Sequence, residues 1–303
     1  MNNKKIHFAA IDIGSNAIRL IIKGIEKDEI TTVDSLEQDI LVRFPLRLGD
    51  DAFTQGKISK EKIERLIHLM KAFRQMMKMF NIVACKAYAT SAMRDAANGK
   101  KIVNKIRRKT GIHVEIINGE EEARIIYENH VERTLGQDKD YLYMDVGGGS
   151  TQISLIHLGE PIYSHSFNIG TVRMMNNIVL PEEKELFLQK LKELHAQYPD
   201  LRLIGSGGNI IKISKLQQDT TQRQMLKAKA LETLYEELSP LSIEERMKKH
   251  KLKRDRAEVI VPAAAVFQEA IRVLEVPEVI VPSIGIADGI VNNLFASYTA
   301  EKS

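Results

Sequence analysis

Three short turns along the chain have the residue types that bind phosphate. Glycine lets backbone amides approach an anion closely, and serine, threonine and asparagine add neutral hydrogen-bond donors. Any one of these turns could equally be a tight connection between two strands, or between a strand and a helix. Three of them in one chain favour a phosphate site. They read Gly14-Ser15-Asn16, Gly147-Gly148-Gly149-Ser150-Thr151 and Gly205-Ser206-Gly207-Gly208-Asn209.

Two arginines could complete such a site. Arg94 follows a predicted strand, and Arg19 lies on the second strand of the first hairpin. Either guanidinium could hold a phosphate through two parallel hydrogen bonds, and either could form an ordinary surface salt bridge instead. The predicted phosphate-binding residues are Ser15, Asn16, Arg19, Arg94, Gly147, Gly148, Gly149, Ser150, Gly207 and Gly208.

Two aspartates, Asp12 and Asp145, end the apolar runs that lead into the first two turns. A buried carboxylate is unfavourable unless a cation or a hydrogen-bond donor compensates it. Mg²⁺ prefers carboxylate, water and phosphate oxygens, which fits a carboxylate beside a phosphate site. Each aspartate could instead cap its own hairpin turn. For the pair together we favour metal binding, and we predict Mg²⁺ as the cofactor.

Three successive glutamates, Glu120, Glu121 and Glu122, follow Asn118. Neighbouring carboxylates raise one another's proton affinity, which is the direction that a general base near pH 7 requires. The same residues are also typical of the first turn of a helix, with Asn118 as its N-cap. Spacing alone leaves both interpretations open.

The elements that must position these residues occur twice. Residues 6–13 and 18–25 are apolar runs around the first turn, and residues 141–146 and 151–158 repeat the pattern around the second. Helical spacing then indicates helices, the first of them with Ser59 as N-cap. This repetition predicts a duplicated α/β domain with a cleft between the copies. The predicted helices cover residues 58–80, 100–110, 181–197, 224–254, 256–274 (broken or capped near Pro262) and 286–298.

Composition narrows the class of protein further. The 303 residues are 44 % hydrophobic and 28 % charged, which is typical of two globular domains and excludes a coiled coil or a collagen. The only cysteine is Cys85, so no intrachain disulfide and no thiolate metal site can form. No secretory leader and no apolar run of about 20 residues is visible, so we expect a cytoplasmic protein without a membrane partner. The net charge of +4 is too small to indicate nucleic acid as a partner.

In this order the motifs resemble the exopolyphosphatase / guanosine pentaphosphate phosphohydrolase (Ppx/GppA) family of the actin-like ATPase superfamily. The resemblance implies two ribonuclease H-like domains with an interdomain cleft, a phosphate substrate, Mg²⁺ dependence and Glu122 as the catalytic base. We place the first domain at residues 1–124, joined by the last helix at about 286–303, and the second at residues 125–285. The matching motifs are Ala10-Ile11-Asp12-Ile13-Gly14-Ser15-Asn16 with Arg19, Thr90-Ser91-Ala92-Met93-Arg94, Ile117-Asn118-Gly119 with Glu121-Glu122-Ala123-Arg124, Asp145-Val146-Gly147-Gly148-Gly149-Ser150-Thr151, Ile169-Gly170-Thr171-Val172-Arg173 and Gly205-Ser206-Gly207-Gly208.

Four positions depart from the family pattern. The most important is Gln152, which is neutral where the family usually has a carboxylate. Asn209 replaces a threonine, and the last two departures lie in Arg256-Ala257-Glu258 and Ala287-Asp288-Gly289. A carboxylate-to-amide change near a metal can weaken ion binding or misplace the attacking water.

The predicted function is that of a phosphoanhydride hydrolase. Its substrate would be inorganic polyphosphate, losing terminal phosphate, or guanosine pentaphosphate, losing its 5′-phosphate. Gln152 motivates an alternative, a non-catalytic or weakly active protein that binds polyphosphate or the alarmone. A third reading is an ATP-dependent kinase or a chaperone-type ATPase of the same superfamily. A homodimer is compatible with the sequence.

Overall fold

The computed structural model describes most of the chain, in two compact units. The first unit comprises residues 1–129 and 286–303, and the second comprises residues 130–285. The last helix thus belongs with the beginning of the chain. Each unit is described by itself below. The described residues are 5–27, 32–127, 136, 138–217, 224–282 and 285–301.

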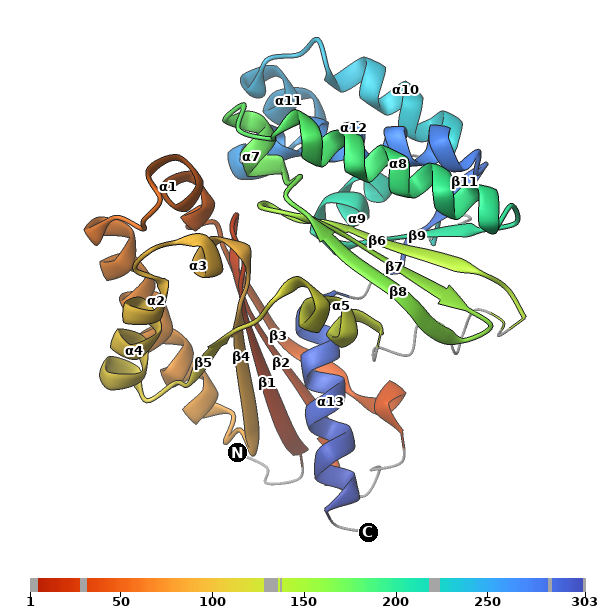
Figure 1. The fold of residues 1–303 in the computed structure, drawn as a ribbon. Helices are drawn as coiled ribbons and strands as arrows, with labels where there is room; N and C mark the ends of the chain where they lie inside the picture. Colours follow the sequence, from red (N-terminus) through yellow and green to blue (C-terminus); the bar gives the residue numbers. More distant parts are fainter. Residues whose placement is uncertain are drawn as a thin grey trace. The chain divides into compact units, whose positions relative to one another are not determined.

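The first unit is built on a five-stranded sheet with the order β3-β2-β1-β4-β5 (Figure 1). Strands β1, β2 and β3 form an antiparallel meander, whereas β4 and β5 run parallel to β1. The predicted opening hairpin is therefore present. The strands are β1 (Lys5–Ile13), β2 (Ile18–Glu26), β3 (Glu37–Phe44), β4 (Ala84–Ala89) and β5 (Val114–Ile116).

Alternate residues of β1 enter two different cores, because side chains alternate between the faces of a strand. Ile11 packs with one set of helices, whereas Phe8 packs on the opposite face under the last helix, α13. The Phe8 ring makes edge contacts with Phe295 at 5.9 Å and with Tyr298 at 5.5 Å between ring centroids. The sheet of the first unit is thus covered on both faces (Figure 1).

One face of this sheet is covered by α1 (Leu48–Gln55), α2 (Lys60–Met79), α3 (Ser91–Asp95) and α4 (Gly99–Thr110), and the other by α5 (Gly119–Tyr127) and α13 (Ile286–Ala300). A short 3₁₀ turn, η2 (Val33–Ser35), precedes β3. Ser59 caps α2 as predicted, since its side chain accepts from the Lys62 amide. Gly111 ends α4 at a φ of +74°, where a glycine avoids the strain of a side chain.

The second unit repeats the plan with one extra strand. Its sheet has the order β10-β11-β9-β6-β7-β8, in which β6, β7 and β8 form the antiparallel meander and β9 and β11 run parallel to β6. The short strand β10 pairs antiparallel with β11. The strands are β6 (Tyr141–Val146), β7 (Thr151–His157), β8 (Glu160–Phe167), β9 (Arg202–Ser206), β10 (Met225–Lys227) and β11 (Glu278–Ile280).

Helix α12 is the centre of the helical layer in the second unit, because the other five helices in the list below all pack against it. Its buried side chains include Phe267, which lies in the same apolar core as the strands. The helices are α7 (Thr171–Met175), α8 (Pro181–Gln197), α9 (Gly207–Leu216), α10 (Ala228–Leu238), α11 (Ile243–His250) and α12 (Arg254–Leu274).

The predicted α/β class with a duplicated, hairpin-led sheet is confirmed. Both sheets place the strand that carries the aspartate between an antiparallel meander and two parallel strands. The long helix predicted over residues 224–254 is wrong. This segment forms β10, α10 and α11, because Pro240 follows α10 and Ser242 starts a new helix with a complete capping box. The break predicted near Pro262 is also wrong, since α12 continues through it.

None of the helices in the described ranges is both long and apolar enough to cross a bilayer.

Candidate active site

In the first unit, the segments that follow β1, β4 and β5 meet at one edge of the sheet. These three strands are parallel, so their carboxyl ends lie at the same edge, which is where open α/β sheets bind ligands. The Ser15 hydroxyl joins two of the segments. It lies 2.8 Å from the Ser91 hydroxyl and accepts from the Ala92 amide at 3.1 Å. The predicted first turn and the start of α3 are therefore in direct contact.

The backbone of the first turn is held from behind by the start of α1. The carbonyl of Ser15 accepts from the Gly49 amide at 2.8 Å, and that of Asn16 accepts from the Arg47 amide at 2.9 Å. In a trans peptide the C=O and the next N–H point in opposite directions. The amides of Asn16 and Ala17 consequently face away from α1. They form a small row of outward donors at the sheet edge.

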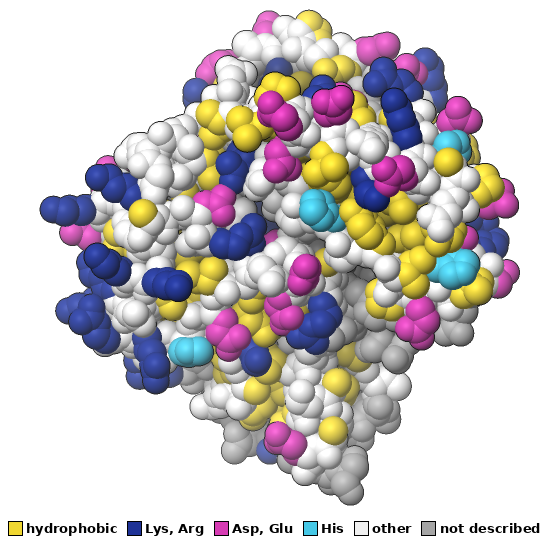
Figure 2. All heavy atoms as spheres, viewed as in Figure 1, with side chains coloured by type: hydrophobic (Ala, Val, Ile, Leu, Met, Phe, Trp, Pro, Cys, Tyr) yellow, Lys and Arg dark blue, Asp and Glu magenta, His cyan; other side chains and the backbone are white. Residues whose placement is uncertain are grey.

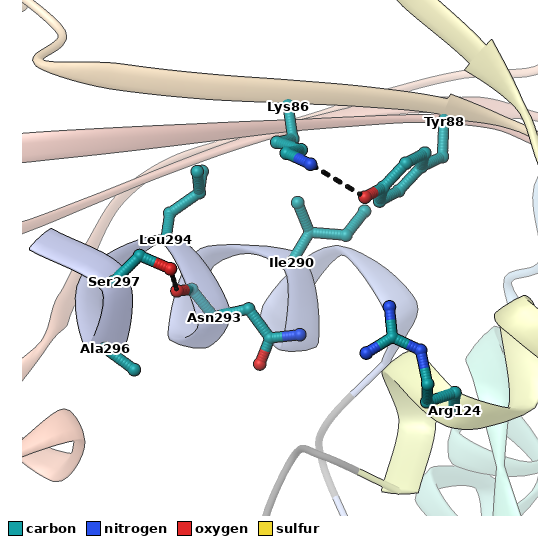
Figure 3. Close-up of a pocket in the computed structure, with 8 residues that line it drawn as sticks. All are labelled: Lys86, Tyr88, Arg124, Ile290, Asn293, Leu294, Ala296 and Ser297. Carbon is teal, nitrogen blue, oxygen red and sulfur yellow. Dashed lines mark hydrogen bonds between the residues drawn. The ribbon is translucent and has the colours of Figure 1, made fainter.

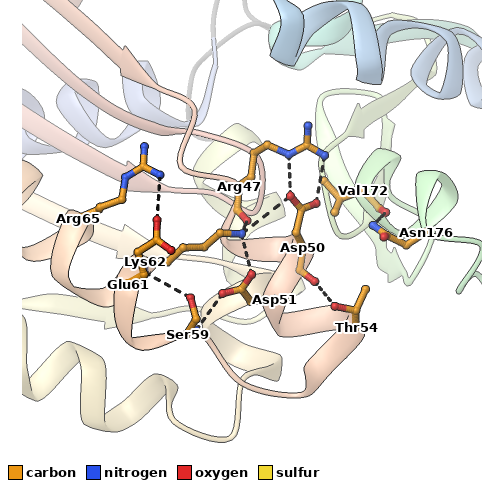
Figure 4. A network of polar contacts seen from close by, with 10 residues as sticks. All are labelled: Arg47, Asp50, Asp51, Thr54, Ser59, Glu61, Lys62, Arg65, Val172 and Asn176. Carbon is orange, nitrogen blue, oxygen red and sulfur yellow. Dashed lines mark hydrogen bonds and ion pairs between the residues drawn. The ribbon is translucent and has the colours of Figure 1, made fainter. Parts of the chain in front are cut away.

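Arg47, whose φ is +54°, is held in place by a network of charges (Figure 4). Its guanidinium binds both carboxylate oxygens of Asp50, at 2.8 and 3.1 Å. Lys62 donates to its carbonyl at 2.5 Å and pairs with Asp51 at 2.8 Å. Burial raises the pKa of Asp51, but hydrogen bonds from Lys62 and Ser59 outweigh it and hold that pKa below its usual value. The charged network thus fixes the amide that supports the first turn.

Asp12 and Arg19, predicted for metal and for phosphate, are bound to each other. They face one another across the β1–β2 hairpin, and an Arg19 nitrogen lies 2.5 Å from an Asp12 oxygen. Only 2 % of Asp12 is exposed, so this partner compensates a carboxylate that would otherwise be buried alone. Arg19 retains further N–H donors, because a guanidinium carries five.

Arg94 links α3 to the segment that carries the glutamates. It donates to the Ile117 carbonyl at 3.0 Å and lies 3.7 Å from Asp95, which leaves most of its donors for another acceptor. Asn118 follows Ile117 and accepts from the Glu122 amide through its carbonyl, at 3.1 Å. The structure therefore places the predicted Arg94 and the start of α5 side by side.

The three glutamates have different surroundings. Arg124 binds the Glu121 carboxylate at 3.0 and 2.6 Å, and these hydrogen bonds, with the charges of Arg124 and Lys86, hold its pKa below the usual value. The increase in proton affinity expected from neighbouring carboxylates is therefore reversed at Glu121. Glu120 is exposed, whereas Glu122 is 7 % exposed. Glu122 is the one buried carboxylate of the run.

In the second unit, the triple-glycine turn is held in the same way as the first turn. The carbonyls of residues 147, 148 and 149 accept in order from the Thr171 amide at 3.0 Å, the Val172 amide at 2.8 Å and the Arg173 Nε at 2.8 Å. The amides of residues 148–150 therefore point away from α7. Within the described part of the chain, no backbone carbonyl accepts from them. Gly148, Gly149 and Ser150 thus present three successive donors.

Asp145 packs tightly against the third glycine-rich turn. It is 8 % exposed and accepts from the Ser206 hydroxyl at 3.2 Å. Gly207 has a φ of +88°, and a Cβ there would lie 2.5 Å from an Asp145 oxygen, so only glycine fits. Helix α9 begins at Gly207. Gly207 and Gly208 are therefore in its first turn, where the amides and the helix dipole favour an anion.

Gln152 occupies the position in the second hairpin that Arg19 occupies in the first. It faces Asp145 across β6 and β7, as Arg19 faces Asp12 across β1 and β2. Gln152 is 4 % exposed, and its Nε2 has no hydrogen-bond partner among the described residues. A buried donor of this kind is unfavourable by about 1–3 kcal/mol unless an acceptor reaches it. A water or a phosphate oxygen would be such an acceptor.

Two further cations near the third turn were not predicted as site residues. Arg256 donates to the side-chain oxygen of Asn209, whose nitrogen in turn donates to the Val146 carbonyl at 3.0 Å. Lys212 lies one helical turn after Asn209, and its pKa is lowered by burial and then by the charges of Arg256 and Lys215. Because α9 starts at Gly207, Lys212 lies three residues after Asn209 on the same helix, and this spacing indicates that both side chains lie on one face. Arg256 lies in the Arg256-Ala257-Glu258 segment compared with the family pattern, but nothing in the sequence indicates its contact with Asn209.

The donor sets of both units fit Mg²⁺ that arrives with a phosphate. Among the described residues no group of three or more His, Cys, Asp and Glu side chains could hold a metal ion. Each unit instead provides one buried aspartate at a strand end, Asp12 or Asp145. Mg²⁺ is commonly held by one or two carboxylates, with waters and substrate phosphates as its other ligands. Neither unit forms an all-protein cage.

The sequence profile of the Ppx/GppA phosphatase family matches residues 36–297. The chain belongs to the Ppx/GppA phosphatase family. The family predicted from the motifs is thereby confirmed.

Two relatives show how far the similarity to other Ppx/GppA phosphatases extends. Exopolyphosphatase 1 of Mycobacterium tuberculosis is 24 % identical over 307 residues, which cover 94 % of this chain and 87 % of the relative. A bifunctional 3-dehydroquinate synthase/phosphatase of Fusobacterium nucleatum is 32 % identical over 179 residues. That match covers 57 % of this chain and 26 % of the bifunctional protein, so the chain spans about a quarter of that relative.

Solved structures show the Ppx/GppA fold over nearly the whole chain. The Aquifex aeolicus family member is similar with a TM-score of 0.76 and 24 % identity, covering 99 % of both chains. An exopolyphosphatase from Cytophaga hutchinsonii gives a TM-score of 0.83 and 21 % identity, covering 96 % of this chain and 98 % of that one. These likenesses confirm that the chain has the fold of the Ppx/GppA family.

Proposed function

We propose that this Ppx/GppA phosphatase releases terminal phosphate from inorganic polyphosphate. The observation that carries the proposal is the arrangement of two hairpin turns. The carbonyls of each turn accept hydrogen bonds from a neighbouring segment, so the amides that follow them point away from that segment. The exopolyphosphatase of Mycobacterium tuberculosis, which matches this chain over most of both lengths, supports the same reaction. Phosphoanhydride hydrolysis requires neutralisation of phosphoryl charge more than covalent chemistry.

The proposed roles follow from the surroundings of each residue. The amides of Gly148, Gly149 and Ser150 would bind phosphoryl oxygens. The guanidinium of Arg94 would donate two further hydrogen bonds to the same phosphate. Glu122 would accept a proton from a water molecule. The oxygen of that water would form a bond to the terminal phosphorus while the bridging P–O bond breaks. Glu122 is the buried carboxylate of the three glutamates, which shields it from bulk solvent.

We assign Asp12 and Asp145 to the binding of Mg²⁺ together with substrate phosphates. When bound, the ion would supply positive charge at the phosphoryl oxygens. Arg19 would share the oxygens of Asp12 with the ion, or bind phosphate through its other donors. Ser15, Asn16, Gly147, Gly207 and Gly208 complete the proposed phosphate contacts.

A basic helix face favours polyphosphate over a compact nucleotide. Helix α4 has no acidic residue, and none of its lysines and arginines forms an ion pair with a described residue. Figure 2 shows Lys and Arg side chains gathered where Figure 1 places α2 and α4. The helix starts at Gly99, four residues after the end of α3, which carries Arg94. A long polyanion bound at Arg94 could continue along this face.

The experiment is a comparison of two neighbouring glutamates. Glu122→Gln should lower kcat for phosphate release from polyphosphate by about 100-fold or more, because it removes the base. The control is Glu120→Gln, in the same helical turn but exposed, which should change kcat less than about threefold. Full activity of the Glu122 variant would show that another group activates the water.

Gln152 favours a second candidate, a protein that binds polyphosphate or guanosine pentaphosphate without hydrolysing it. The amide replaces a carboxylate expected by resemblance to the family, and it lies opposite Asp145. Phosphate release with Mg²⁺ from polyphosphate, guanosine pentaphosphate and ATP, measured beside the binding of each, separates the candidates. Binding without release would support the binder, and release from ATP alone would support an ATPase.

Three features remain predictions from the sequence: the cytoplasmic location, the absence of a nucleic-acid partner and a homodimer. The cleft between the two domains and the domain boundary near residue 124 are proposals as well.

A further inference from the structure

A cavity in the first unit is lined by none of the residues given catalytic or phosphate-binding roles (Figure 3). It has a volume of about 350 Å³, near the lower end of the roughly 300–1,000 Å³ of small-molecule sites. Three elements form its walls, namely β4, α5 and α13, and all belong to the first unit. Its lining residues are Lys86, Tyr88, Arg124, Ile290, Asn293, Leu294, Ala296 and Ser297.

The charges at this cavity add up to one excess positive charge. The Lys86 ammonium lies 3.4 Å from the Tyr88 hydroxyl and 5.7 Å from the centre of the Tyr88 ring. No carboxylate of the described residues lies within ion-pair distance of Lys86, and its charge acts on the Glu121 carboxylate from farther away. Arg124 is paired with Glu121, so its charge is largely neutralised. Lys86, Arg124 and Glu121 together leave one net positive charge, which favours a ligand with a single negative charge.

The remaining walls combine apolar surface with a few polar groups. Ile290 and Leu294, on α13, lie four residues apart and therefore face the cavity together. Asn293 and Ser297 add an amide and a hydroxyl from the same helix. Figure 3 shows Lys86 on the strand side, with Arg124 entering from α5. An apolar floor beneath a cationic rim suits an amphipathic anion better than a bare ion.

We propose that this cavity binds a small organic monocarboxylate with an apolar body. Lys86 and Arg124 hold the carboxylate, and the body rests on Ile290 and Leu294. Arg124 and Glu122 are two residues apart on α5. A bound carboxylate shares Arg124 with Glu121 and thereby alters the first turn of the helix that presents Glu122. The site regulates phosphate release, a consequence that rests on the function proposed above.

The binding test uses 2-naphthoate as probe, titrated calorimetrically into the full chain. We expect binding, with affinity at least about tenfold weaker in Lys86→Gln, because a charge-assisted hydrogen bond is lost. Ala296→Phe should abolish binding, since Ala296 is exposed and a phenyl ring there fills the cavity without entering the core. The matched control is Lys101→Gln, which removes an exposed lysine on α4 and should leave the affinity unchanged.

Two comparison ligands test the chemical class. Neutral 2-naphthamide should bind at least about tenfold more weakly than 2-naphthoate, since it lacks the charge. Inorganic phosphate should not compete with 2-naphthoate. Equal binding of the amide, competition by phosphate, or unchanged affinity in Ala296→Phe would each overturn the assignment.

The regulatory part has a separate readout. The probe should change kcat for phosphate release in the unaltered chain and leave it unchanged in Ala296→Phe. Binding without any change in kcat would refute the coupling through α5 and leave the site in place. If no substrate released phosphate, the proposed function would fail, whereas the calorimetry would still decide whether the cavity binds carboxylates.

Discussion

Gly207 provides a quantitative test of how Asp145 is positioned. At its φ of +88° a side chain introduces backbone strain of about 1–2 kcal/mol. A Cβ would also lie 2.5 Å from an Asp145 oxygen, whereas ordinary contact begins near 3.4 Å. In the Gly207→Ala variant the Asp145 carboxylate must therefore move away from residue 207 by roughly 1 Å. Displacements of this size at a reacting centre reduce rates by about 100-fold.

The matched control is Gly56→Ala. Gly56 also has a positive φ, +67°, but no heavy atom lies within 4 Å of the position of its added Cβ. The Gly56→Ala variant should be destabilised by backbone strain alone, and its kcat/KM should be unchanged. Gly207→Ala should be destabilised at least as much and lose about 100-fold in kcat/KM for phosphate release. Thermal unfolding and steady-state kinetics of both variants measure these effects. Similar kcat/KM values for the two would refute the argument that the glycine positions Asp145.

Two further predictions concern the first unit. Phe8→Ala should lower the free energy of unfolding by about 3–5 kcal/mol, because the ring is completely buried between the sheet and α13, and urea unfolding measures the loss. A loss below about 1 kcal/mol would contradict this packing. The pKa of Asp51 is lowered in the fold, so its contribution to stability is complete above about pH 4 and disappears as the pH falls through the lowered value. Asp51→Asn should therefore lower the unfolding midpoint at pH 7 and much less near pH 2, and equal decreases at both pH values would be evidence against the assignment.

Much of the fold was predictable because regular elements have regular patterns. The apolar runs around the two aspartates became β1–β2 and β6–β7, and the helical spacing after Ser59 became α2. The short helices α3 and α7 were missed, because five residues are too few for a periodic signal. These short helices depend on contacts with residues distant in the sequence. In α7, for example, the Val172 amide donates to the Gly148 carbonyl.

The candidate site was predictable in residue type but not in pairing. Asp12 and Arg19 were both proposed, yet their ion pair depends on the hairpin register, which the motif does not state. The three glutamates were expected to raise one another's proton affinity, but at Glu121 the hydrogen bonds from Arg124 reverse the effect. The bond from Arg256 to Asn209 joins residues 47 apart, a separation that only the folded unit closes.

The discontinuous first unit has a consequence for biosynthesis. The apolar face formed by Ile6, Phe8 and Ile21 is completed by α13, which the ribosome makes about 160 residues after the rest of this unit. At 5–20 residues per second this interval lasts about 8–30 s. During that time one face of the first sheet lacks α13 and is exposed. The second unit is contiguous in the sequence and can already fold. Newly made chains should therefore depend on chaperones for longest at their first strands rather than at their last.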